Sequence, residues 1–163
     1  IVIFRTDNPT PPKVPVVKVK SIFTDYPNVM LHPIKTPIIE LKVDDPYMYV
    51  NKAKKKIDPD GSASPQIIDG RTLLPIRAII EEMGGTVEWN GRDKKITLRV
   101  QDRTVEMWLG KKTAYNNMWY FEFDVVPQII NGRTMVPLRV VTEQLGCKVG
   151  WDGETQKITL SPK

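Results

Sequence analysis

Alternating hydrophobic and polar residues run through most of the chain and predict β-strands. The clearest example is residues 39–44, where Ile39, Leu41 and Val43 alternate with charged residues, so that the apolar side chains share one face of a strand. Similar short runs recur about every 8–12 residues and are separated by turn-forming residues. The other predicted strands lie near residues 47–50, 55–57, 67–68, 71–74, 86–89, 95–98, 104–109, 112–115, 118–123, 129–130, 133–136, 149–151 and 157–160.

Two segments have a helical spacing instead. After Pro75 and after Pro137, apolar residues recur at positions i, i+3, i+4 and i+7, which places them on one face of an α-helix. Proline is tolerated in a first helical turn, and Gly84 and Gly146 are suited to end a helix. The apolar positions are Ile76, Ile79, Ile80 and Met83, and then Leu138, Val141, Thr142 and Leu145. We therefore expect an α+β fold, mainly antiparallel β-sheet, with two short helices.

The same stretch occurs twice in the chain. Residues 65–98 and 127–160 align without a gap at an offset of 62 positions, and 18 of the 34 aligned positions are identical, so the chain contains an internal repeat. Each copy is predicted to form a hairpin, a short helix and a second hairpin. Asp69-Gly70 and Asn131-Gly132 lie at the tips of the first hairpins, and such pairs suit a type I′ turn, in which both central residues have positive φ.

Residues 1–45 are interrupted repeatedly by proline, and we interpret them as an extended arm that precedes a folded domain at residues 46–163. The arm has short strand-like runs and a stiff segment of polyproline type at residues 8–12, but no helical pattern. Because these runs cannot form a stable sheet alone, we predict that the arm pairs with an exposed sheet edge. The edge belongs either to the arm's own domain or to the domain of another molecule of the protein, and pairing with another molecule would generate a filament. The apolar arm residues available for this contact are Ile1, Val2, Ile3, Phe4, Val17, Val19 and Phe23.

The repeated stretch resembles a known family. The pattern I-[DN]-G-R-T-x-x-P-x-R-x-x-x-E-x-x-G, followed by V-x-W-[ND]-G and K-I-T-L, is similar to the copper amine oxidase N-terminal domain, or stalk domain, of bacterial surface proteins. The resemblance covers roughly residues 47–160. It implies an antiparallel sheet wrapped on short helices, in an exported module that is not catalytic. The chain departs from the family pattern at Val50-Asn51-Lys52, where V-N-G is expected at a hairpin tip.

Charge and composition narrow the functional classes. The net charge is +5, and a cluster at Lys52 and Lys54–Lys56 would suit nucleic acid. No aromatic residue is interleaved with these lysines, so we interpret them as a solvated hairpin tip, which could also rest on an anionic cell-wall polymer. No apolar run approaches the roughly 20 residues that span a membrane. The chain begins with Ile1 rather than Met, which suggests that a signal peptide has been removed and that the protein is extracellular or at the cell surface.

Catalysis, metals and cofactors are not predicted. The chain has one histidine, His32, which cannot supply the several imidazoles of a copper site. A calcium loop from Asp58 to Asp69 is disfavoured because its glycine is misplaced and Pro65 interrupts it. The single cysteine, Cys147, takes the place of Gly85 in the first copy. We expect Cys147 to be a small buried hydrophobic residue, or an intermolecular disulfide partner if it is exposed.

Several repeated residues are predicted to stabilise the scaffold. Arg77 and Arg139 fall in the first helical turn, where a cation opposes the helix dipole. We expect each guanidinium to cross to the sheet and donate to backbone carbonyls, and a ligand-binding role is the alternative. The residues with a predicted structural role are Arg77, Arg139, Glu81, Glu143, Gly70, Gly132, Trp89 and Trp151, the two tryptophans as core anchors packed on the helices.

Trp119, Tyr120 and Phe121 form the most conspicuous candidate interaction site. Three consecutive aromatic residues cannot all face one side of a strand, so at least one is exposed or covered by another segment. A carbohydrate-binding face or a protein contact would use such residues. We therefore expect a non-catalytic extracellular structural module that associates with itself, with binding of cell-wall polymer or polysaccharide as the alternative.

Overall fold

The structure is a computed structural model that describes residues 37–117 and 119–163, apart from the side chains of Val141 and Thr142. These residues belong to one compact unit, residues 35–163. The predicted arm contacts at Ile1–Phe4 and at Val17, Val19 and Phe23 lie outside the described residues. Residues 39–42, which we assigned to the arm, form a strand inside the folded unit.

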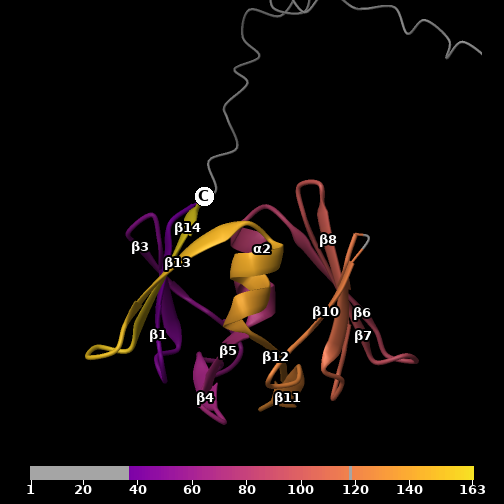
Figure 1. Cartoon of the computed structure of the whole chain (residues 1–163). Coiled ribbons are helices and arrows are strands. Elements are labelled where there is room, and N and C mark those ends of the chain that lie inside the picture. The colour runs from indigo at the N-terminus through magenta and orange to yellow at the C-terminus, as the bar shows by residue number, and fades with distance from the viewer. Residues whose placement is uncertain (1–36, 118) are drawn as a thin grey trace, which may run out of the picture. The chain divides into compact units, whose positions relative to one another are not determined.

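Three antiparallel sheets make up the described part of the chain. Sheet A has the order β13 (Cys147–Asp152), β14 (Lys157–Pro162), β1 (Ile39–Lys42), β2 (Tyr47–Val50), β3 (Ala53–Lys56). Sheet B has the order β11 (Gln128–Ile130), β12 (Arg133–Pro137), β5 (Arg71–Pro75), β4 (Gln66–Ile68). Sheet C has the order β10 (Trp119–Glu122), β9 (Thr113–Asn116), β8 (Arg103–Trp108), β7 (Lys95–Val100), β6 (Thr86–Asn90). Figure 1 shows sheets A and C on either side of the helical segments, with sheet B below them.

The described residues contain one α-helix, not the two that the sequence predicted. In the first copy, α2 spans Ile76–Glu82 and buries Ile76, Ile79 and Ile80. In the second copy, the corresponding segment η1, Val140–Gln144, is a short π-helix. Ala78 of α2 is replaced there by the buried Val140. A β-branched residue crowds the preceding helical turn and costs up to about 0.7 kcal/mol relative to alanine, so the α-helix is less favourable at this position of the second copy.

The repeat is longer than the ungapped sequence comparison shows. β1, β2 and β3 correspond to β8, β9 and β10 at an offset of 66 positions: Leu41 pairs with Ile158 as Met107 pairs with Ile96. The turns also match, because the Asn51 side chain accepts a hydrogen bond at 2.9 Å from the backbone N–H of Ile38, just before β1, as the Asn117 side chain does at 2.8 Å from Thr104 of β8. The loop that follows β3 is four residues longer than the loop that follows β10. The offset therefore falls from 66 to 62, and this gap hides the first half of each copy. Corresponding residues of the two copies are called twins below.

The two copies are related by a local two-fold axis. In sheet B, Leu74 of β5 lies directly opposite its twin Val136 of β12, as expected for residues on such an axis. The chain also closes on itself, because β14 pairs with β1 just as β7 pairs with β8. The first strand of the described domain is thus fixed by the last, and the two copies share one core.

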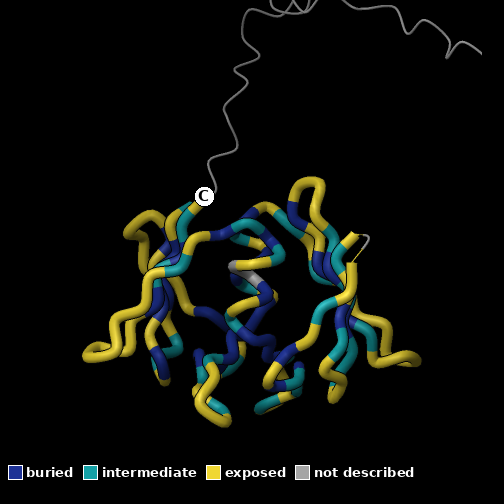
Figure 2. The backbone as a smooth tube through the Cα atoms, viewed as in Figure 1, coloured by how far each residue is buried: buried dark blue, intermediate teal, exposed yellow. Residues whose placement is uncertain are grey.

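The core lies between the sheets and around α2, and Figure 2 shows its residues in dark blue on the inner strands, with exposed residues at the hairpin tips. Leu74, Ile80 and Val136 are fully buried within it. Trp89 and Trp151 are not, because 45% and 47% of their surface is exposed. The prediction that they are core anchors is therefore wrong, since β6 and β13 are edge strands whose ends extend past the core. Among the described residues, no helix has the length and apolar character needed to cross a bilayer.

Candidate functional site

The two glycine turns of sheet B have the predicted geometry. Asp69 and Gly70 have φ of 48° and 72°, and Asn131 and Gly132 have φ of 51° and 76°, so both central residues are left-handed as a type I′ turn requires. Each turn is followed directly by an arginine, Arg71 or Arg133. The tight turn fixes where this arginine leaves the hairpin.

The two arginines form reciprocal ion pairs between the copies. Arg133 of the second copy donates to Asp58 with both Nε and Nη2, at 2.5 and 3.1 Å. Its twin Arg71 contacts Asp124 through Nε at 2.9 Å and Nη2 at 2.7 Å. The two aspartates are twins as well, each placed just after an edge strand. Each copy therefore holds the loop of the other.

The two ion pairs differ in burial. The Asp58 side chain is 11% exposed, whereas that of Asp124 is 61% exposed. The hydrogen bond from Arg133 lowers the pKa of Asp58, and the same contact raises the pKa of Arg133. The sequence patterns did not predict a role for Arg71, Arg133 or Asp124, and they included Asp58 only in a disfavoured calcium loop. An alignment that allowed the four-residue gap would have matched Asp58 with Asp124. It would have shown that both the aspartate and the arginine of the ion pair recur in the two copies.

Each ion pair forms one side of a surface groove. Groove 1 has a volume of about 490 Å³ and lies between β10, the β4–β5 turn and the η1 segment, with Trp151 on its wall. Groove 2, its twin, has a volume of about 660 Å³ and is bordered by Trp89. The exposed tryptophans that were predicted to fill the core thus line two related grooves.

The predicted structural pairs on the helical segments also border the grooves. Arg77 and Glu81 lie in groove 2 and form an i,i+4 ion pair at 3.6 Å, with side chains 61% and 57% exposed. Arg77 therefore stays at the surface, and the prediction that it crosses to the sheet is wrong. Its twin Arg139 is also exposed, and both Arg139 and Glu143 line groove 1.

The contents of the two grooves have diverged. In groove 2, Lys55 of β3 and Glu82 of α2 form an ion pair at 2.6 Å that links the edge of sheet A to the helix. The twins of these residues in groove 1 are Phe121 and Gln144. An aromatic ring and an amide therefore stand where groove 2 has an ion pair, and groove 1 is the more apolar of the two.

The candidate aromatic residues lie on β10, one of the two edge strands of sheet C. Trp119 and Tyr120 are 72% and 71% exposed. Phe121 lies on the face of β10 opposite to Tyr120 and packs edge-on against Phe123, with ring centroids 5.2 Å apart. Tyr120 continues an aromatic row on the outer face of sheet C through Tyr115, at 6.4 Å, to Trp108, at a further 5.8 Å. The sequence predicted that at least one of these three side chains is exposed or covered by another segment, and Trp119 and Tyr120 are exposed.

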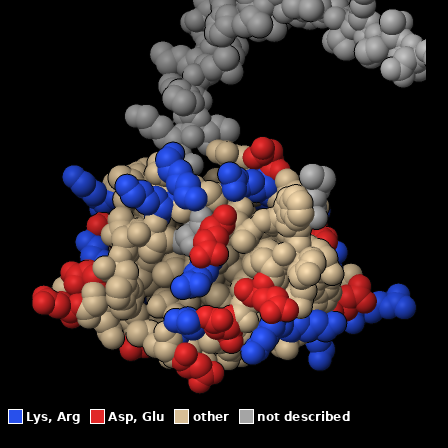
Figure 3. All heavy atoms as spheres, in the orientation of Figure 1, with Lys and Arg blue, Asp and Glu red and all other residues tan. Residues whose placement is uncertain are grey.

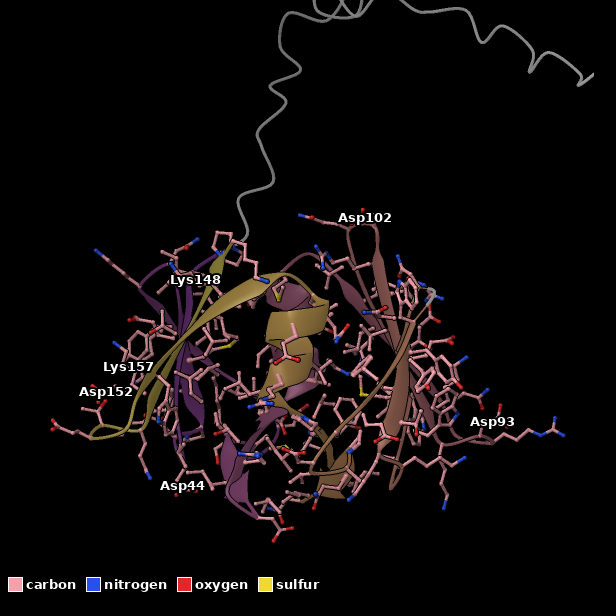
Figure 4. The ribbon with its side chains drawn as sticks, in the orientation of Figure 1. Asp44, Asp93, Asp102, Lys148, Asp152 and Lys157 are labelled. Carbon is pink, nitrogen blue, oxygen red and sulfur yellow. The ribbon has the colours of Figure 1, made fainter. Side chains whose placement is uncertain are left out.

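The twin of β10 has a different surface. β3 is one of the two edge strands of sheet A, and all four of its residues, Ala53 to Lys56, are exposed. Lys54 takes the place of Tyr120. In the view of Figure 3, basic side chains gather along the upper rim, and acidic and basic side chains mix over the rest of that face. Figure 4 marks the twin hairpins β6–β7 and β13–β14 with Asp93 and Asp152, which point to opposite flanks.

Cys147 is buried and packs with its Sγ 3.9 Å from Sδ of Met83. Burial raises the pKa of this thiol, so the side chain is a small hydrophobic residue of the core. An intermolecular disulfide, which would require exposure, does not fit this position. Among residues 37–117 and 119–163, no group of three or more His, Cys, Asp and Glu side chains is arranged to hold a metal ion.

Comparison with known proteins identifies the family. The chain has no match among curated proteins. The family model described as copper amine oxidase N-terminal domain matches residues 57–160, which is more than half of the 163 residues. This range contains both sheet B hairpins, both helical segments and the β6–β7 and β13–β14 hairpins described above. The chain therefore belongs to the copper amine oxidase N-terminal domain family.

Proposed function

We propose that this protein is a non-catalytic structural module that works outside the cell by associating with other copies of itself. The family is that of the N-terminal, non-catalytic part of copper amine oxidases. The extracellular location is supported by the resemblance of the repeat to stalk domains of bacterial surface proteins. Cleavage of the chain by a protease added to intact cells would test this location, and a chain protected until the cells are lysed would contradict it.

The unequal edges of the two copies carry the proposal of self-association. The backbone of β10 and β3 is equivalent, yet β10 exposes Trp119 and Tyr120 where β3 has Ala53 and Lys54. A fold that only had to be stable could keep lysines at both edges. Exposed aromatic residues that lie together are instead typical of surfaces that another molecule covers.

Sedimentation velocity of the full-length chain over a wide range of concentrations tests the proposal. We expect the weight-average sedimentation coefficient to rise with concentration, and negative-stain images to show linear polymers at the upper end of the range. A chain that remains monomeric at the highest concentration reached would refute self-association.

Polysaccharide binding is a second candidate, favoured by one observation, the half-exposed Trp151 in groove 1 beside Arg139 and Glu143. An indole face and flanking charged groups can hold a sugar ring by stacking and hydrogen bonds. Trp89 supplies a matched control because it has the same exposure in the twin groove. If groove 1 binds sugar, Trp151→Ala should reduce retention on insoluble polysaccharide several-fold, and Trp89→Ala should not. Equal retention of both variants and of the unchanged protein would remove this candidate.

A further inference from the structure

The edge strand β10 lacks the protection that its twin β3 has. Within the described part of the chain, both strands end their sheets and have a neighbouring strand on one side only. Natural edge strands are commonly guarded against further pairing by charged residues, lysine above all. β3 has three consecutive lysines and fits this rule, whereas β10 has three consecutive aromatic residues, which favour strand pairing.

Groove 1 offers space for side chains of an added strand. It lies directly beside β10 and includes Phe121, Phe123 and Leu138 among its lining residues. The acidic residues Glu122 and Glu143 border the same groove. In the twin groove, the ion pair between Lys55 and Glu82 crosses from the edge strand to the helix. An extended apolar segment with a nearby cation therefore fits beside β10 and not beside β3.

We propose that β10 is an acceptor edge, and that the donated strand is the run Ile1–Phe4 of a second copy of this chain; this inference rests on the proposed self-association. The run has four apolar residues, three of them β-branched, and β10 is four residues long, so one face of the added strand can enter groove 1. Arg5 follows the run directly and complements Glu122 and Glu143.

The sequence between donor and acceptor permits an intermolecular contact. Residues 5–36 separate Ile1–Phe4 from the described domain, and 32 residues can span at most about 100–115 Å. The four prolines between residues 9 and 15 favour an extended path close to the donor. A spacer of this length permits Ile1–Phe4 to contact β10 of another molecule.

Two full-length variants test the donor strand and the acceptor strand individually. Ile3→Asp places a charge in the apolar run and removes the donor. Trp119→Lys with Tyr120→Lys gives β10 the lysine character of β3 and removes the acceptor, at two positions that are more than 70% exposed. Tyr115→Lys is the matched control, because Tyr115 lies on the same aromatic row but in β9, which is not an edge strand. Circular dichroism and melting temperature show whether each variant is folded.

Sedimentation velocity then gives distinct outcomes. Each of the two variants alone should be monomeric, with at least a tenfold weaker self-association than the unchanged protein, while Tyr115→Lys should associate normally. A 1:1 mixture of the donor variant and the acceptor variant should form dimers that do not grow further, because only one arm and one edge remain intact. If the unchanged chain associates and these variants do so equally well, or if their mixture stays monomeric, the strand-donation inference is wrong and the proposed function stands. If the unchanged chain never associates, the proposed function fails as well.

Discussion

The tip of the β2–β3 hairpin is a strained turn that a single substitution should relieve. Asn51 and Lys52 have φ of 47° and 71°, the same left-handed pair as the two glycine turns of sheet B. The second residue of those turns is Gly70 or Gly132, whereas here it is Lys52. This is the position at which the chain departs from the V-N-G pattern of its family, so Lys52→Gly restores the residue that the turn geometry favours.

The expected gain follows from two opposing terms. A left-handed conformation costs a residue with a Cβ atom roughly 1–2 kcal/mol, and glycine at position 52 would not bear this cost. Glycine loses more backbone entropy on folding, about 0.5–1 kcal/mol. At the midpoints of these two ranges, the free energy of unfolding should therefore rise by about 0.75 kcal/mol, which corresponds to an increase in melting temperature of about 2–4 °C for a domain of this size.

Urea unfolding and thermal melts of the full-length chain measure this difference, and Gly70→Ala provides the matched control. Gly70 has φ of +72°, and a Cβ atom built on it has no heavy atom within 4 Å. The substitution to alanine thus changes the backbone preference without a steric clash, and should destabilise the fold by about 1 kcal/mol. If Lys52→Gly lowers the midpoint while Gly70→Ala also lowers it, the side chain of Lys52 contributes more than its backbone strain and the reasoning is refuted.

Three further predictions concern the core and the reciprocal ion pairs. Gly85→Ala should lower the free energy of unfolding by about 1–3 kcal/mol in urea titrations, because the new Cβ would clash with the backbone oxygen of Arg99 in β7; an unchanged midpoint would contradict this contact. Cys147 should react with a thiol reagent far more slowly in the folded protein than in urea, since burial both covers it and raises its pKa; equal rates would show that the site opens. Asp58→Asn should destabilise the protein at pH 7 more than Asp124→Asn, and the difference from the unchanged protein should shrink as the pH falls through the acidic range, because the lowered pKa of Asp58 stabilises the fold only while the carboxylate is ionised. A pH-independent difference in melting temperature would contradict this account.

The local structure could largely be predicted from the sequence because it depends on short-range chemistry. Alternation located β1 and the strands of both repeat copies, and the residue types of Asp69-Gly70 and Asn131-Gly132 were enough to specify type I′ turns. The second helix could not be predicted in this way. Its apolar spacing is helical, yet the segment forms a π-helix, because apolar spacing identifies the buried face of a helix and not its hydrogen-bond register.

The errors at the candidate site arose where tertiary position decides burial. Trp89 lies two residues after Val87 in β6, so the two side chains are on the same face of the strand, as the pattern predicts. The pattern cannot show that β6 is an edge strand or that the end of this strand extends past the core. It therefore predicts burial for Trp89 and Trp151, which are half-exposed. Similarly, Arg71 and Asp124 are 53 positions apart, and only the two-fold arrangement brings them together.

Because the chain contains two copies of one unit, comparing the copies distinguishes residues that stabilise the fold from residues that have other roles, without any comparison between proteins. Two copies that share one backbone need the same turn and ion-pair residues, and Arg71 and Arg133 with their aspartate partners are retained in both. β3 and β10 are under the same structural demands but have different side chains, so stability alone does not explain the aromatic residues of β10. Under the proposed strand donation, pairing at both β3 and β10 would give each molecule one donor and two acceptors, and assemblies could branch. Lysines at β3 would disfavour pairing there, so that only β10 of these two edges would accept a strand and assemblies would be linear.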